Sequence, residues 1–280
     1  MGTTKFGGNK AEVDSDATLA LQPKLPEQTL EDLYSRAQKS FKLIKLPPLH
    51  EHSLTGPAQA KLWAAFASVH SMYFVMNISR GLWRGLRKKE HRGRIEERHV
   101  DLLRAAIAFA GAGLDSALKQ LIRDTVRPLI AANKGCRDMY MGFVDSYITS
   151  GEVMNRKHLR TILVDERGPA SALTELYERH LTGDSLQSVE QVRKVCAALG
   201  VNEKDISARL KPGSTLEKMF KARNSIVHEL DLKRGGSSEQ ISRSLKEARQ
   251  FSREALDVTQ LIINEVAKAL DNGATKNISA

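Results

Sequence analysis

The chain has 280 residues, of which 41% are hydrophobic, and this length supports one large domain or two small ones with a sizeable core. Its formal net charge of +10 favours polyanionic partners such as nucleic acid, although a solvated basic surface accounts for the same charge. Two cysteines exclude a disulfide framework, and we expect both to be reduced, buried thiols of a cytosolic protein.

Neither a membrane span nor a secretion signal is predicted. The longest apolar run, AAIAFAGAGL at 105–114, is about half as long as a bilayer crossing requires. The first residues, MGTTKFGGNKAEVDSD, contain no apolar stretch flanked by basic residues and a small-residue cleavage site. We therefore expect a cytoplasmic protein that does not associate with membranes.

Two N-terminal regions are predicted to precede the main domain. Residues 1–26 are rich in Gly, Thr, Asp and Pro without periodicity, which predicts a disordered arm. Residues 27–94 form a predicted N-terminal helical extension, with a short helix near 30–43 and a long helix that begins at Pro57. The apolar residues of the long helix recur at helical spacing: Leu62, Phe66, Val69, Tyr73 and Met76.

A basic segment follows at 80–99, RGLWRGLRKKEHRGRIEERH, with eight Arg or Lys residues against three Glu. Such a cluster is a candidate RNA contact, but a solvated junction between two helices explains it as well. The candidate RNA-binding residues in this segment are Arg80, Arg84, Arg87 and Lys88.

The strongest helical pattern covers 99–130, and Pro128 is expected to mark its end. Asp115 is anomalous, because in helical projection it lies close to Gly111 and therefore on the side of the helix that faces apolar residues. Gly111 and Gly113 each weaken a helix by about 1 kcal/mol, which indicates that another backbone approaches closely at this level. The apolar stripe consists of Leu103, Ile107, Ala110, Leu114, Leu118 and Leu121.

Shorter helices are expected through residues 131–212. Their predicted positions are about 137–149, 154–163 and 169–181, followed by the capped helix of SVEQVRKVCAALGV, which Ser188 begins and Gly200 ends. Almost nothing in this region has the pattern of a β-strand. The sequence therefore predicts an all-α fold.

The helix that follows carries a cation on its apolar face. Its start is set by STLE at 214–217, a capping box with Ser214 as the N-cap. Arg223 lies on the same helical face as five apolar residues, which are Leu216, Met219, Phe220, Val227 and Leu230. A guanidinium in that position must be paired or pay a large desolvation cost. Asp115, the second anomalous charge, is a natural partner for it.

Arg223, Asn224, His228 and, as the partner of Arg223, Asp115 are the candidate catalytic residues. Asn224 and His228 are four apart and share a face, whereas Arg223 joins them in one groove if the helix ends or loosens near the histidine. These groups suffice to cleave RNA without a metal, because the ribose 2'-OH is the nucleophile, His transfers protons and Arg stabilises charge on the phosphate. By itself Arg-x4-His is a weak pattern, and a lone His near a helix C-terminus usually interacts with the helix dipole.

The end of the chain is predicted to form a basic loop and a last helix. The loop KRGGSS at 233–238 adds Lys233 and Arg234 as candidate RNA-binding residues. The helix is expected over about 239–270, with Gly273 just past its end and a tail at 273–280.

Three stretches together resemble the HEPN superfamily. LEKMFKARNSIVHELDL resembles its Arg-x(4 to 6)-His signature, most closely that of the RiboL-PSP-HEPN type, in which an RN-x-I-V-H-E-x-D run precedes a loop and a final helix. RAAIAFAGAGLDSALKQLI is similar to the first core helix of that family with its acidic residue. HLTGDSLQSVEQVRKVCAALGV resembles the family's S-[FL]-Q-S turn and the helix after it. The resemblance covers roughly residues 95–270, within a predicted HEPN-like domain at 95–272.

The resemblance implies an up-and-down helical bundle that forms a homodimer, here with an extra N-terminal helical layer. Active HEPN proteins are metal-independent endoribonucleases, in which the Arg and His of both subunits line one cleft. Carried over, Arg223 would stabilise the phosphorane, His228 would act as general acid or base, Asn224 would orient substrate or imidazole, and Asp115 would hold Arg223. No cofactor and no metal are implied.

Three classes of function follow from these observations. The first is an endoribonuclease that leaves a 2',3'-cyclic phosphate and acts as a toxin or anti-phage effector, as the resemblance implies. The second is a non-catalytic dimerisation or RNA-binding module in which Arg223 and Asp115 form a structural ion pair. The third is a component of a two-protein toxin–antitoxin or defence system, for which an acidic neutralising partner would suit a chain of charge +10.

Overall fold

The computed structural model describes residues 46–86, 97–149, 160, 162–201, 204–233 and 239–278. Within these ranges the chain is helical, and the only β-type pairing is an isolated antiparallel bridge between Leu232 and Gln240. The prediction of an all-α fold is therefore confirmed. The predicted arm at 1–26 and the short helix near 30–43 lie outside the described residues, as does most of the helix predicted at 154–163.

The described elements are α-helices and one 3-10 turn. In chain order they are the 3-10 turn η1 (Ser53–Thr55), α2 (Gly56–Leu86), α3 (Glu97–Ala132), α4 (Lys134–Thr149), α6 (Pro169–Thr182), α7 (Val189–Ala198), α8 (Lys204–Arg209), α9 (Thr215–Glu229) and α10 (Leu245–Ile278).

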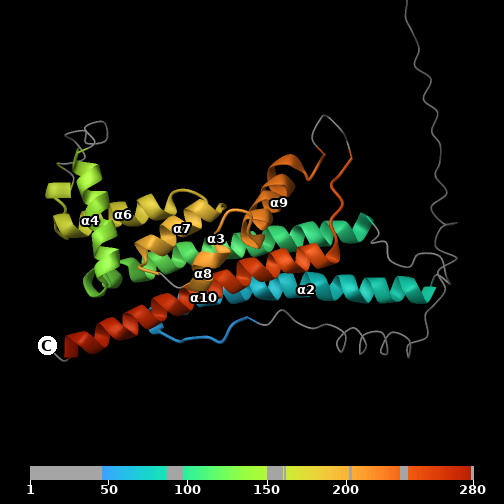
Figure 1. Cartoon of the computed structure of the whole chain (residues 1–280), viewed down its shortest axis with the longest axis horizontal. Coiled ribbons are helices and arrows are strands. Elements are labelled where there is room, and N and C mark those ends of the chain that lie inside the picture. Colours follow the sequence, from blue (N-terminus) through green and yellow to red (C-terminus); the bar gives the residue numbers. More distant parts are fainter. Residues whose placement is uncertain are drawn as a thin grey trace, which may run out of the picture.

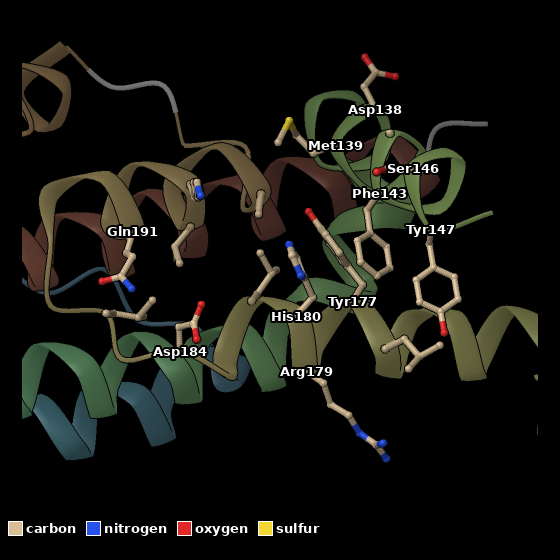
Figure 2. Close-up of a pocket in the computed structure, with 17 residues that line it drawn as sticks. Asp138, Met139, Phe143, Ser146, Tyr147, Tyr177, Arg179, His180, Asp184 and Gln191 are labelled. Atoms are coloured by element: carbon tan, nitrogen blue, oxygen red, sulfur yellow. The ribbon is translucent and has the colours of Figure 1, made fainter. Parts of the chain in front are cut away.

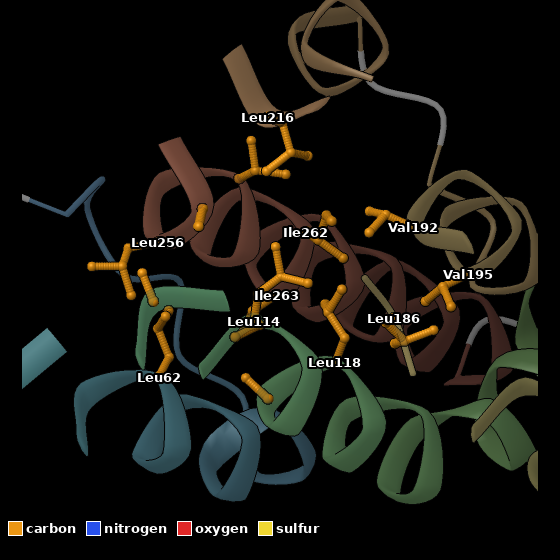
Figure 3. Packing of buried hydrophobic residues seen from close by; sticks show 14 of the residues in the cluster. Leu62, Leu114, Leu118, Leu186, Val192, Val195, Leu216, Leu256, Ile262 and Ile263 are labelled. Atoms are coloured by element: carbon orange, nitrogen blue, oxygen red, sulfur yellow. The ribbon is translucent and has the colours of Figure 1, made fainter. Parts of the chain in front are cut away.

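Three long helices, α2, α3 and α10, lie side by side and form the body of the molecule (Figure 1). α2 runs antiparallel to α3, whereas α10 runs in the same direction as α3. α4, α6 and α7 gather at one end of the three long helices, and α9 packs against α3 and α10. Figure 3 shows how leucine, isoleucine and valine side chains from α2, α3, α7, α9 and α10 meet in one core.

The predicted N-terminal extension contributes directly to this core. Leu62, Val69 and Tyr73 of α2 are almost fully buried in the same cluster as Leu114 of α3 and Ile262 of α10. The residues before and after position 94 therefore share one hydrophobic core. The domain boundary near residue 94 stays a prediction. None of the helices in the described ranges combines the length and the apolarity that a membrane crossing requires.

The predicted caps and one of the predicted close contacts are present. Ser188 Oγ accepts a hydrogen bond from Gln191 N at the start of α7, and Ser214 Oγ accepts one from Glu217 N at the start of α9. Gly113 of α3 lies against Ala65 of α2, where an added Cβ would overlap the alanine methyl group. Glycine at this position thus lets the two long helices pack closely.

The ends of two helices differ from the prediction. Pro128 does not end α3, which continues to Ala132 with the proline inside the helix. α10 begins at Leu245 rather than near 239, because residues 239–241 pair with the chain that follows α9. The same helix runs through Gly273 to Ile278, and a Cβ on Gly273 would lie 2.5 Å from that of Ala132. Gly273 is therefore a packing residue and not a helix end.

Candidate functional site

Three of the four candidate catalytic residues, Arg223, Asn224 and His228, come together at the C-terminal end of α9. Arg223 Nη1 donates a hydrogen bond to Asn224 Oδ1 at 3.1 Å and lies 3.5 Å from His228 Nε2. The helix ends at Glu229, directly after His228, and Leu230 adopts a left-handed conformation with φ of 52°. Because the helix stops here, the imidazole is exposed and within reach of the guanidinium although the two residues are five apart.

Arg223 is only partly satisfied by its surroundings. Its Nη1 also donates to Gln187 Oε1, whereas its Nε is buried and has no hydrogen-bond partner among the described residues. Burial lowers the pKa of Arg223, and the negative charge of Asp115 opposes this effect. A buried guanidinium N–H without an acceptor is costly, and such groups gather where a protein binds something.

Gly111 makes room for this arginine. A Cβ on Gly111 would lie 3.2 Å from Cγ of Arg223, so the stem of the arginine crosses α3 where α3 has no side chain. The close approach predicted for Gly111 is therefore made by a side chain rather than by a backbone. Any larger residue at 111 would push the guanidinium away from its present position.

Asp115 does not form the direct ion pair with Arg223 that the sequence led us to expect. Its Oδ1 accepts a hydrogen bond from Leu186 N at 2.6 Å and pairs with Lys119 Nζ at 3.2 Å. The connection to Arg223 is indirect, since Leu186 is followed in the chain by Gln187, whose side chain binds the guanidinium. The prediction of direct contact is wrong, because Asp115 is bound by Leu186 N and Lys119, whereas Arg223 is bound by Gln187 and Asn224.

Gln187 is the site residue that the sequence analysis missed. Its backbone N–H donates to Gln191 Oε1 at 3.0 Å, and Gln191 also binds the N-cap Ser188, so the turn is fixed to the first turn of α7. The signal was present, because Gln187 is the Q of the S-L-Q-S turn at 185–188. The resemblance of this stretch predicts a turn, but it does not predict that the side chain of Gln187 binds Arg223.

The apolar residues on one face of α9 are buried in the first half of the helix and exposed near its end, beside the candidate site. Leu216 and Met219 in the first half of the helix are fully buried, whereas the exposed fractions of Val227 and Leu230 are 45% and 69%. The exposed imidazole of His228 lies between these two apolar residues in sequence. The end of α9 thus presents a mixed polar and apolar surface to solvent.

The chain directly after α9 is anchored by a buried ionic cluster that the sequence analysis did not predict. Asp231 is fully buried and accepts hydrogen bonds from Arg104 Nε at 3.1 Å and from Arg243 Nη2 at 2.6 Å. Burial alone would raise the pKa of Asp231, but the hydrogen bonds from the two arginines outweigh it and hold the pKa below its ordinary value. The cluster ties α3 and the segment before α10 to the turn that follows His228.

The predicted RNA-binding residues fall only partly within the described structure. Arg80 lies half-buried near the C-terminal end of α2, and Lys233 is paired with Glu239 at 2.6 Å. Arg84 belongs to α2, but its side chain is outside the described part of the structure. Arg87, Lys88 and Arg234 lie outside the described residues altogether.

The two cysteines are buried away from solvent. Cys136 and Cys196 are free and buried, and burial raises the pKa of each thiol to about 12. In the ranges that the structure describes, no group of three or more His, Cys, Asp and Glu side chains is arranged to hold a metal ion.

Comparison of the chain with family models, with curated proteins and with solved structures found no match. The resemblance to the HEPN superfamily accordingly rests on the residues quoted from the sequence.

Proposed function

We propose that the chain is a metal-independent endoribonuclease of the HEPN type. The observation that supports this most is the meeting of Arg223, Asn224 and His228 at the end of α9, where the imidazole is exposed. A guanidinium with an unpartnered N–H and a histidine 3.5 Å away suit a ligand that carries both negative charge and a transferable proton. An RNA phosphodiester with its adjacent 2'-OH has both.

The proposed reaction is an internal transfer at phosphorus. One imidazole takes the proton of the 2'-OH, and the 2' oxygen then bonds to phosphorus while the bond from phosphorus to the 5' oxygen breaks. The departing 5' oxygen takes a proton from an imidazolium, which gives a 2',3'-cyclic phosphate and a 5'-OH. Arg223 stabilises the negative charge on the non-bridging oxygens of the phosphorane. Asn224 holds the guanidinium through its Oδ1.

A homodimer is part of this proposal. The two proton transfers occur on opposite sides of phosphorus, and a chain with one His beside Arg223 provides both groups when two copies share a cleft. The exposed Val227 and Leu230 next to His228 offer apolar surface for such a contact. As a cellular role we propose a toxin or anti-phage effector that acts on RNA in the cytoplasm, with an acidic protein as a possible neutralising partner for a chain of charge +10.

One observation favours a second candidate, a non-catalytic RNA-binding or dimerisation module. Arg223 Nη1 already has acceptors in Gln187 and Asn224 of its own chain, and these contacts give the arginine a structural role without any reaction. Under this alternative the protein binds RNA and leaves it intact.

Cleavage in the presence of a chelator tests the proposal. Purified protein incubated with total RNA and excess EDTA should produce fragments that end in a 2',3'-cyclic phosphate and begin with a 5'-OH, as detected by end-specific ligation. Loss of cutting on chelation, or 3'-OH ends, would contradict the proposed chemistry. RNA that is retained by the protein but never cut would favour the binding module.

Gln187→Leu tests whether the turn positions Arg223. The change keeps the side-chain size and removes the acceptor, so kcat should fall about tenfold while KM and the melting temperature change little. Gln187→Glu is the matched variant and should restore most of the rate, because a carboxylate also accepts from a guanidinium. Equal kcat in the wild type and the leucine variant would show that Arg223 needs no support from this turn.

A further inference from the structure

A pocket of about 870 Å³ opens between α4, α6 and α7, next to the turn at 184–187 (Figure 2). Its size is in the range of small-molecule sites. One wall is an aromatic cluster centred on Phe143, whose ring centroid lies 5.0 Å from that of Tyr177, 5.1 Å from that of His180 and 5.8 Å from that of Tyr147. These rings provide flat apolar surface for a planar ligand.

Tyr177 indicates that the pocket is built to bind something. The residue is only 2% exposed, and its hydroxyl group is buried without a hydrogen-bond partner among the described residues. Figure 2 shows the side chain projecting from α6 into the pocket beside His180. Burial raises the pKa of Tyr177 to about 12, so the hydroxyl stays protonated near neutral pH. A buried donor of this kind lacks only the acceptor that a ligand would bring.

The other polar groups restrict the chemistry of that ligand. Asp184 and Gln191 line the pocket, and Oε1 of Gln191 is already used by Gln187 N and Ser188, which leaves its amide NH2. Arg179 is paired with Glu175 and points away from the pocket (Figure 2), so Lys194 remains as the principal cation against the carboxylates of Asp138 and Asp184. The pocket therefore disfavours a phosphate or a fatty-acid carboxylate. It favours a neutral ring that carries both N–H donors and acceptors.

The pocket is mechanically connected to the candidate active site. Leu186 is one of the residues that line the pocket, and its backbone N–H donates a hydrogen bond to Asp115. The next residue, Gln187, binds Arg223. A ligand that packs against Leu186 therefore touches the turn that holds the guanidinium.

We propose that this pocket binds a nucleobase, either as a free nucleoside or as a base unstacked from a single RNA strand, and that its occupancy is transmitted to Arg223 through the turn at 184–187. The base stacks on the Phe143 cluster, a ring nitrogen or carbonyl accepts from Tyr177 Oη, and base N–H groups donate to Asp184. Transmission to catalysis rests on the proposed ribonuclease function, whereas base binding does not.

The test uses probes that cannot be cut. Binding of guanosine, adenosine, cytidine and uridine to the full chain is followed by saturation-transfer NMR, and binding of a 2'-O-methyl RNA hexamer by fluorescence anisotropy. Gly142 lines the pocket and a Cβ added to it would meet nothing within 4 Å, so a side chain can start there; the ring of Gly142→Phe should occupy the pocket and weaken binding at least tenfold. Met141→Phe is the matched control, because Met141 is the exposed neighbour and is not among the residues that line the pocket. Tyr177→Phe should weaken binding about fivefold without lowering the melting temperature.

Each outcome decides between the sources or overturns the proposal. Nucleoside binding that Gly142→Phe removes and Met141→Phe keeps supports a free nucleoside as ligand. Hexamer binding with the same dependence, but no nucleoside binding, supports a base within the strand. If neither probe binds, or if Gly142→Phe binds as the wild type does, the pocket proposal is wrong, whatever the cleavage assay with EDTA shows.

Discussion

Replacing His228 with alanine should reduce RNA cleavage by about 100- to 10,000-fold, which is the usual contribution of a general acid or base. The side chain is exposed at the last turn of α9, so its removal creates no cavity, and the free energy of unfolding should change by less than about 0.5 kcal/mol. Single-turnover cleavage of a defined RNA in EDTA gives the rate, and calorimetry gives the melting temperature.

The neighbouring residue provides the control. Glu229 is also exposed at the end of α9, and Glu229→Ala should stay within about twofold of the wild-type rate, since surface changes away from the chemistry are nearly neutral. Arg223→Lys keeps the positive charge but loses the planar fork of donors, and its rate should fall with that of His228→Ala. A His228→Ala protein that folds normally and still cuts RNA at the wild-type rate would rule out the proposed role of the imidazole.

Helical periodicity and capping signals were sufficient to predict most of the helices. The stripe of α3 and the N-cap at Ser214 each depend on residues close together in sequence, and both are present. Pro128 and Gly273 were misassigned because local propensity disfavours them in helices, whereas packing of α10 against Ala132 rewards a glycine at 273. A tertiary contact therefore decides the conformation at position 273.

The candidate site was predictable only along its own helix. Arg223, Asn224 and His228 lie within six residues, so helical geometry relates them directly. The link from Asp115 to Leu186 joins residues 71 apart in sequence, and the link from Arg223 to Gln187 joins residues 36 apart. No periodicity specifies against which residues a turn between two helices will pack, so the placement of the turn at 184–187 between Asp115 and Arg223 required the three-dimensional structure.

The buried cluster at Asp231 could not be predicted from the sequence either, because its contacts also join distant parts of the chain. Asp231 belongs to the stretch that carries the HEPN resemblance, but its partners Arg104 and Arg243 lie 127 and 12 residues away. Arg223 is recognisable in the sequence as a single arginine on an otherwise apolar helix face. The same anomaly at Arg104, which is 7% exposed, was hidden among the charged residues at the start of α3.

Asp231→Ala should lower the free energy of unfolding by about 3–5 kcal/mol, because it removes the fully buried carboxylate that Arg104 and Arg243 share and leaves each guanidinium only a more exposed carboxylate, Asp101 or Glu247. Arg104 and Arg243 are 7% and 9% exposed, so water cannot replace the lost partner. Urea denaturation followed by circular dichroism measures the change. Asp101→Ala is the control, since Asp101 also binds Arg104, at 2.8 Å, but is 74% exposed, and its loss should cost less than about 1 kcal/mol.

The pH dependence separates the ionic contribution from simple packing. Because the folded-state pKa of Asp231 lies below its ordinary value, its carboxylate stabilises the fold at pH values above the unfolded pKa, about 3.9, and this stabilisation is lost as the pH falls through the folded pKa. The difference in unfolding free energy between the wild type and Asp231→Asn should therefore be full at neutral pH and shrink below about pH 4. If the difference in unfolding free energy stays constant down to pH 2, the charge of Asp231 does not contribute and the cluster stabilises the fold through packing alone. Since Asp231 follows His228 by three residues, the asparagine variant should also cut RNA more slowly at neutral pH, as the end of α9 loses its anchor.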